Sequence, residues 1–112
     1  MEVRNLFGKY VAKFIDDKPV PAGVMIEFKA GGSNDAVDIQ GRVVNNMNGH
    51  LKVEGGKLSG SIRSTSMVGS DELMMMEEAL IQGFVDGMKC LLKDGGKLTL
   101  HSDSHTFKFV SA

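Results

Sequence analysis

The sequence predicts an α+β domain that is mostly β. We expect a strongly curved antiparallel sheet or cracked barrel of about seven or eight short strands, with one helix inserted before the last three strands. A Gly-Gly hairpin phrase occurs twice, at 54–58 (EGGKL) and 94–98 (DGGKL). Several other segments alternate apolar and polar residues, which is typical of half-buried strands. A single segment, which begins after Ser70, has apolar residues at helical spacing instead.

The composition is that of an ordinary soluble globular protein, and we expect one domain over residues 1–112. The formal net charge is −1 and the lysines are interspersed with acids, so we expect no nucleic acid partner and no membrane insertion. The lone Cys90 excludes an intramolecular disulfide and favours a reducing compartment. The N-terminus lacks the layout of a signal peptide. These features indicate a cytoplasmic protein, and we expect a monomer.

The first strands follow from alternation. Residues 8–15 place Tyr10, Ala12 and Phe14 on one face, and a turn follows at 16–19. A second strand spans about 23–29 and a third runs from 37 to 43. We expect residues 45–49 to form a polar loop.

The two Gly-Gly phrases predict tight hairpins, because glycine adopts positive φ without strain. In the first hairpin a two-residue loop pairs Glu54 with Lys57 and Val53 with Leu58. This register places the apolar residues of both strands on the same face. The same loop in the second hairpin pairs Asp94 with Lys97 but Lys93 with Leu98, which fits only in part. Further strands are predicted at 88–93 and at about 105–110.

The helix is predicted to begin after Ser70, a good N-cap, with Asp71 and Glu72 in its first turn. Glycines at 83 and 87 weaken its far end, so we expect it to stop near Val85 or Asp86. At 100° per residue, one broad apolar arc contains Leu73, Met76, Leu80, Ile81, Phe84, Val85 and Met88. We expect the helix to cover the open side of the sheet or to plug one end of a barrel.

Glu77 falls within this apolar arc, so an ideal helix turns its carboxylate toward the core. A carboxylate there needs hydrogen bonds, an ion pair or a proton. We favour a structural role in which Glu77 accepts hydrogen bonds from a loop such as 64–66, or is rotated to the rim. The alternative is a functional carboxylate, because perturbed acids cluster at functional sites.

Met74, Met75 and Met76 span about 200° of the helix, so they cannot all point inward. Met75 lies opposite the apolar arc and is predicted to be exposed. Exposed methionines are adaptable contacts at binding surfaces, which makes Met74 and Met75 the candidate partner-binding residues. The alternative is that Met74 and Met76 fill the core and Met75 is simply tolerated.

No catalytic, metal or cofactor site is predicted. The segment 101–105 (HSDSH) contains histidine, serine and aspartate, but five consecutive residues at a turn diverge and cannot form a triad. A metal would need a third protein ligand besides the two histidines, and Cys90 is the only sulfur of a cysteine available. We expect Cys90 to act as a small buried hydrophobe.

The order of several short segments resembles the META/HslJ-like domain family. These segments are Leu6-x-Gly8-x-Tyr10, Asp17-Lys18-Pro19-Val20, Val24-x-Ile26-x-Phe28, Ser64-Thr65-Ser66-Met67, Glu77-x-x-Leu80-Ile81 and Gly96-Lys97-Leu98-Thr99-Leu100. Where the family often has Gly-Cys-Asn, this chain has Val44-Asn45-Asn46, and a second family cysteine is absent. The chain looks closest to the kinetoplastid members. The resemblance implies a mostly β fold with one helix and no known catalytic residues.

Two functions remain open at this stage. We expect a non-enzymatic protein-interaction module that presents the outer helix face or a strand edge to a partner. The resemblance links such a module to secretory or trafficking processes and virulence in an infective parasite stage, in the cytoplasm near the flagellar pocket. The alternative is a small barrel that carries a lipid or other apolar ligand, with interior room left at Gly41 and Gly60.

Overall fold

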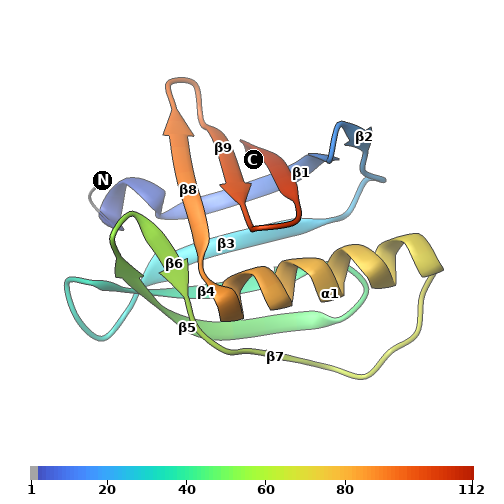
Figure 1. Cartoon of the computed structure of the whole chain (residues 1–112), viewed down its shortest axis with the longest axis horizontal. Coiled ribbons are helices and arrows are strands. Elements are labelled where there is room, and N and C mark those ends of the chain that lie inside the picture. The colour runs from blue at the N-terminus through green and yellow to red at the C-terminus, as the bar shows by residue number, and fades with distance from the viewer. Residues whose placement is uncertain (1–2) are drawn as a thin grey trace.

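The structure, a computed structural model, describes residues 3–112. Its helical elements are the 3₁₀ helix η1 (Val3–Leu6) and the α-helix α1 (Asp71–Asp86) (Figure 1). Its strands are β1 (Gly8–Ile15), β2 (Lys18–Pro19), β3 (Met25–Ala30), β4 (Ala36–Arg42), β5 (Asn46–Glu54), β6 (Lys57–Ser59), β7 (Ile62–Ser64), β8 (Met88–Lys93), β9 (Lys97–His101) and β10 (Thr106–Ser111).

Eight of these strands form a closed antiparallel barrel in the order β10-β9-β8-β6-β5-β4-β3-β1. The first and last strands, β1 and β10, pair from Tyr10–Ser111 to Ile15–Phe107, and this pairing closes the barrel. The short strands β2 and β7 are additional and pair with β1 and β5. The predicted fold class, with its helix before the last three strands, is confirmed.

Apolar side chains at alternate strand positions fill the barrel. In β4, for example, Val37 and Ile39 are buried and Gln40 is exposed. Burial of each large apolar side chain stabilises the fold by about 1.5–3 kcal/mol. The largest fully buried side chains are those of Leu6, Ile26, Phe28, Leu51, Leu58, Leu80, Phe84, Met88, Leu98, Leu100, Phe107 and Phe109.

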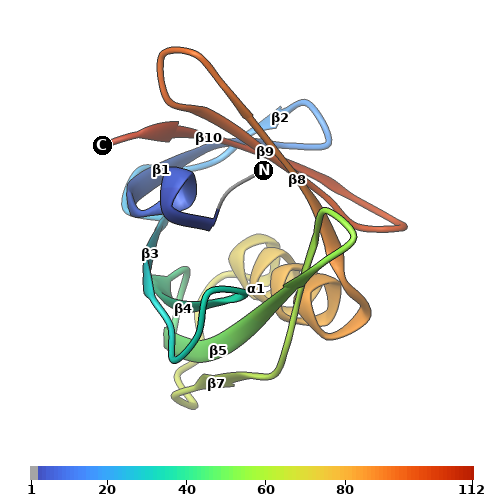
Figure 2. The same cartoon turned by 90° about the vertical axis from the view of Figure 1, so that its left-hand side faces the viewer.

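The helix α1 begins and ends where the sequence predicts. Ser70 Oγ accepts a hydrogen bond from the Leu73 N–H at 3.3 Å, and Gly87 ends the helix with φ of 101°. Figure 2 shows α1 lying within the curve of the sheet, and its buried side packs on β6 and β7. Val85 differs from the prediction because it lies at the edge of the apolar arc and is 51% exposed.

Phe14 does not lie on the inner face with Tyr10 and Ala12, as the alternation predicts. The register between β1 and β10 shifts between Ala12 and Phe14, which is a β-bulge. The extra residue turns Phe14 outward, opposite Lys108, and leaves its side chain 42% exposed. A long-range pairing therefore overrides the local pattern.

Two further predictions are wrong in detail. Residues 46–49 belong to β5 rather than to a polar loop, because they pair with β4 and β7. The second hairpin pairs Lys93 with Lys97 rather than Asp94 with Lys97, so its loop has one more residue. This register places Leu92 opposite Leu98 and keeps their shared face in the core. The first hairpin pairs Glu54 with Lys57 as predicted.

Candidate functional site

The carboxylate of Glu77 is buried on the inner side of α1, with 3% of the residue exposed. Its Oε1 accepts hydrogen bonds from the backbone N–H groups of Val44 at 3.2 Å and Asn45 at 2.7 Å. Its Oε2 accepts from Asn45 Nδ2 at 2.8 Å. A buried carboxylate needs such donors to offset the loss of its hydration. Both oxygens are therefore engaged by the protein itself.

Asn45 connects this carboxylate to the segment that leads into α1. Its Oδ1 accepts hydrogen bonds from Thr65 Oγ1 at 2.8 Å and from the Met67 N–H. Its Nδ2 also donates to the Met67 carbonyl at 3.2 Å. We call Val44, Asn45, Thr65, Met67 and Glu77 the polar clasp, because together they join the β4–β5 turn, the 65–67 segment and α1.

The partner of Glu77 differs from the loop suggested by the sequence. The carboxylate binds the turn at 44–45, and Asn45 rather than Glu77 contacts Thr65. Sequence reasoning missed Asn45, which stood in a predicted surface loop but is only 3% exposed. The polar side-chain atoms of the clasp are hydrogen-bonded within the clasp itself. This geometry fits a structural role in which the clasp positions the start of α1.

Of the three consecutive methionines of α1, Met75 lies on the outer face. Met75 is 70% exposed, Met74 is half-buried and Met76 is 3% exposed. A shallow hollow of about 580 Å³ on this face is lined by Met75, Glu78, Ala79, Ile81, Gln82 and His105. Met74 does not line it. The helix sequence contains acids but no lysine or arginine, so the charged residues of this helix are all acidic.

His105 borders this hollow and is held by the β1–β2 turn. Its Nδ1 lies 2.6 Å from Asp16 Oδ2, and Asp16 Oδ1 accepts from the Thr106 N–H at 2.9 Å. The hydrogen bond from His105, followed by that from Thr106, lowers the pKa of Asp16. Asp16 has a positive φ of 49°, which aspartate tolerates better than most residues.

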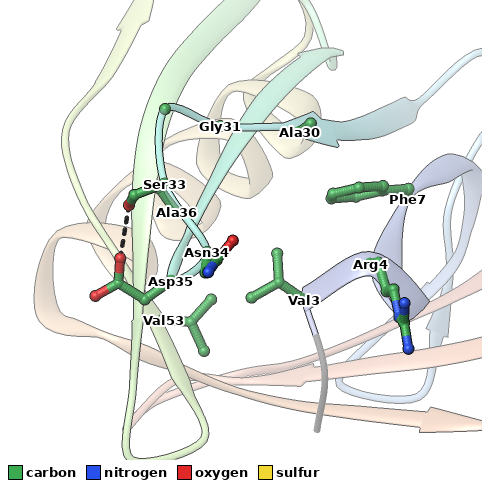
Figure 3. Close-up of a pocket in the computed structure, with 11 residues that line it drawn as sticks. Val3, Arg4, Phe7, Ala30, Gly31, Ser33, Asn34, Asp35, Ala36 and Val53 are labelled. Carbon is green, nitrogen blue, oxygen red and sulfur yellow. Dashed lines mark hydrogen bonds between the residues drawn. The ribbon is translucent and has the colours of Figure 1, made fainter.

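A groove of about 830 Å³ lies between η1 and the β3–β4 loop. Figure 3 shows Val3 and Phe7 facing the loop segment 31–36 across this groove, with Val53 at its side. Tyr10 Oη donates to the Leu6 carbonyl at 2.9 Å and fixes η1 against the barrel. The groove is partly open to the surface.

The described part of the barrel interior offers little room for a ligand. A small cavity beside α1, between Ile39 and Phe84, has a volume of about 10 Å³, roughly the size of one water probe. The glycines expected to leave room do not. A Cβ on Gly41 would lie 2.8 Å from the Met25 carbonyl oxygen, and one on Gly60 would lie 2.3 Å from that of His50. These glycines allow close backbone approach instead.

The segment 101–105 diverges as expected. His101 Nδ1 lies 3.1 Å from Thr106 Oγ1, whereas His105 is bound to Asp16. Over residues 3–112, no three histidine, cysteine or acidic side chains are grouped to hold a metal ion. Burial raises the pKa of the Cys90 thiol to about 12, so it is a weak nucleophile at neutral pH. Cys90 lies opposite Leu100, and Lys89 lies opposite His101.

A family model described as the META domain matches residues 4–112. The chain belongs to the META domain family. The resemblance inferred from the sequence is thus confirmed at the level of the family, whereas the link to its kinetoplastid members stays a prediction. No curated protein matches the chain.

Two solved structures share the fold of this META domain. An NMR structure with 20% sequence identity has a TM-score of 0.84 and covers 99% of this chain and 95% of its own. The NMR structure of a protein from Burkholderia xenovorans has 17% identity and a TM-score of 0.71, and it covers 98% and 86%. At these identities the likeness concerns the fold alone.

The polar clasp brings residues that are far apart in the sequence into one hydrogen-bond network. Two segments that carry the resemblance, at 64–67 and 77–81, meet in this network with residues 44–46, where the chain departs from the family pattern. Within the described residues, no helix has the length and apolar character to cross a membrane.

Proposed function

We propose that this META domain is a non-enzymatic protein-interaction module that binds its partner through the outer face of α1. The observation that carries the proposal is the 70% exposure of Met75 beside a hollow bordered by Ala79 and Ile81. An exposed flexible thioether beside apolar atoms is an adaptable contact. The clasp supports the proposal because it holds α1 at a defined position on the barrel.

The charges around Met75 indicate the chemistry of the partner. Glu78 lines the hollow, and Asp71, Glu72 and Asp86 are exposed on the same helix. A complementary surface carries lysine or arginine around an apolar side chain that contacts Met75. Such charges chiefly raise the association rate, whereas the apolar contact slows dissociation.

The test compares Met75→Glu with Val68→Glu, a matched control. Val68 is 90% exposed and lies before α1, so both variants exchange an exposed apolar side chain for a carboxylate. The protein and both variants are purified gently from their own cells and examined by native mass spectrometry. We expect a protein adduct that Met75→Glu loses and Val68→Glu keeps, with unchanged Tm in both. An adduct that survives in a folded Met75→Glu variant would contradict the proposal.

The second candidate is a carrier of an apolar ligand, which the groove between η1 and the β3–β4 loop favours. Val3, Phe7 and Val53 provide apolar surface there, whereas the cavity under α1 is too small for a lipid. A small-molecule mass that is retained by the native protein and lost in Phe7→Ser would support the carrier. A protein adduct without any small-molecule mass would reject the carrier.

The family resemblance also suggests a setting for the interaction. We propose a role in a secretory or trafficking process linked to virulence in an infective parasite stage, at a cytoplasmic site near the flagellar pocket. The test is fluorescence microscopy of a tagged copy in its own cells. A diffuse signal that does not change between life stages would oppose this assignment.

A further inference from the structure

The outer face of β8, β9, β10 and β1 gathers lysines that are scattered along the sequence. Every second residue of a strand faces outward, so positions far apart in the chain become neighbours across the ladder. We call this surface the basic face; its lysines are Lys13, Lys57, Lys89, Lys93, Lys97 and Lys108, with Lys57 supplied by the adjoining β6. All six are exposed.

The register brings lysines directly opposite each other. Lys57 pairs with Lys89 across β6 and β8, and Lys93 pairs with Lys97 across β8 and β9. Like charges at directly opposed positions destabilise a sheet. Within residues 3–112, no ion pair with a carboxylate involves any of these four lysines. Glu54 lies opposite Lys57 on the other side of β6, whereas an anion bound between Lys93 and Lys97 would relieve the repulsion of that pair.

Exposed apolar side chains lie in the same surface. One row of the ladder runs from Leu91 through Thr99 and Lys108 to Phe14. Leu91 is 47% exposed and Phe14 is 42% exposed, and three strand spacings separate them by roughly 14 Å. An open groove of about 310 Å³ beside Phe14 is bordered by Lys13, Lys93, Lys97 and Lys108.

We propose that the basic face binds an acidic segment of a protein partner, whose carboxylates pair with the lysines and whose apolar side chains contact Phe14 and Leu91. A carboxylate already fits this surface, because Asp17 Oδ1 lies 3.5 Å from Lys108 Nζ. Lysine ammonium groups act as point charges, so they pair with a carboxylate without the planar, bidentate geometry that arginine provides.

A single-stranded nucleic acid suits the basic face less well than an acidic peptide. Such ligands stack successive bases on aromatic side chains, and among the described outward residues of these strands Phe14 is the one phenylalanine. Arginine, the common partner of phosphates and bases, does not occur in β1, β8, β9 or β10.

This inference shares with the proposed function only the premise that the ligand is a protein, since it concerns a different surface of opposite charge. The two can therefore fail separately. Met75→Glu is expected to leave binding at the basic face unchanged, and neutralisation of the lysines is expected to leave the α1 adduct intact.

The test uses a fluorescein-labelled peptide of glutamates interspersed with leucines and measures fluorescence anisotropy. The double variant Lys93→Gln/Lys97→Gln removes one opposed pair. The matched control Lys29→Gln/Lys52→Gln removes two exposed lysines from β3 and β5. We expect about tenfold weaker binding in the first and little change in the control, with affinity that falls as salt rises. A further variant, Phe14→Ser/Leu91→Ser, should weaken the binding of this peptide but not the binding of a peptide that contains glutamate alone.

Three results would overturn the proposal. Equal weakening by both lysine variants would indicate a nonspecific charge effect. Tighter binding of a single-stranded RNA or of phosphatidylserine vesicles than of the peptide would assign the face to another class of ligand. Concentration-dependent self-association in sedimentation, abolished by Lys93→Gln/Lys97→Gln, would make the acidic α1 face of a second copy the occupant. Circular dichroism of each variant verifies that it is folded.

Discussion

Asn45 donates two hydrogen bonds to the Glu77 carboxylate, one from its backbone N–H at 2.7 Å and one from its side-chain amide at 2.8 Å. Thirty-two residues separate the two in the chain. The same Asn45 amide accepts from Thr65, so one buried side chain links a turn, a loop and a helix. Buried networks of this kind stabilise a defined arrangement only when every member is satisfied.

Glu77→Gln is predicted to destabilise the domain by about 1–3 kcal/mol. The amide that replaces one carboxylate oxygen carries donors, and it would face the N–H donors of Val44 and Asn45. Urea denaturation measures the loss, with Glu78→Gln as control because Glu78 is exposed on the same helix. Equal stability of the two variants would show that Glu77 contributes to the free energy of unfolding only through its charge, and not through its hydrogen bonds.

Gly60→Ala is predicted to destabilise the domain by about 1–3 kcal/mol, because the new methyl would lie 2.3 Å from the His50 carbonyl oxygen. Gly32→Ala is the matched control, since its Cβ meets no atom within 4 Å. Thermal denaturation compares the two. A Gly60→Ala protein as stable as the control would mean that the barrel widens there at little cost, and would strengthen the carrier alternative.

Lys93→Glu is predicted to stabilise the domain by about 0.2–1 kcal/mol. It converts the directly opposed Lys93–Lys97 pair from repulsive to attractive. Urea denaturation at low and high salt measures the gain, which should shrink as salt screens the pair. A lower stability of the variant at low salt would refute the repulsion on which the basic face is argued.

Asp16→Asn is predicted to lower stability at neutral pH by less than about 1 kcal/mol, because the Asp16–His105 contact is solvent-exposed. The folded pKa of Asp16 lies below its ordinary value of 3.8. Its contribution is therefore present above pH 3.8 and is lost as pH falls through the folded pKa. Denaturation curves across acidic pH should show the two proteins converging. In a His105→Gln background, most of the stability difference between the protein and Asp16→Asn should disappear. A difference that persists there would exclude His105 as its cause.

Cys90 is predicted to resist alkylation by iodoacetamide in the folded protein. Burial raises the pKa of its thiol from 9.0 to about 12, so little thiolate exists at mildly alkaline pH. Because the folded pKa is the higher one, stability should decline as pH rises from 9.0 toward 12. Cys90→Ala should lack this part of the decline. Rapid labelling of the native protein, followed by mass spectrometry, would contradict the burial of the thiol.

Elements whose causes are local could be predicted from the amino-acid sequence alone. Ser70 and Gly87 bound the helix because capping depends on a few adjacent residues. The Glu54–Lys57 pairing followed from a two-residue glycine turn. The mostly β class followed from alternation, and the family from the order of short segments.

Tertiary structure alone decided what depends on residues distant in the chain. The pairing of β1 with β10 placed the bulge that turns Phe14 outward, and the packing of α1 brought Glu77 to Asn45. The core register of β8 and β9 set Lys93 against Lys97 and brought lysines of several strands together in the basic face. The physical reason is that side-chain direction in a sheet follows from register, and register is chosen by burial of the whole hydrophobic face.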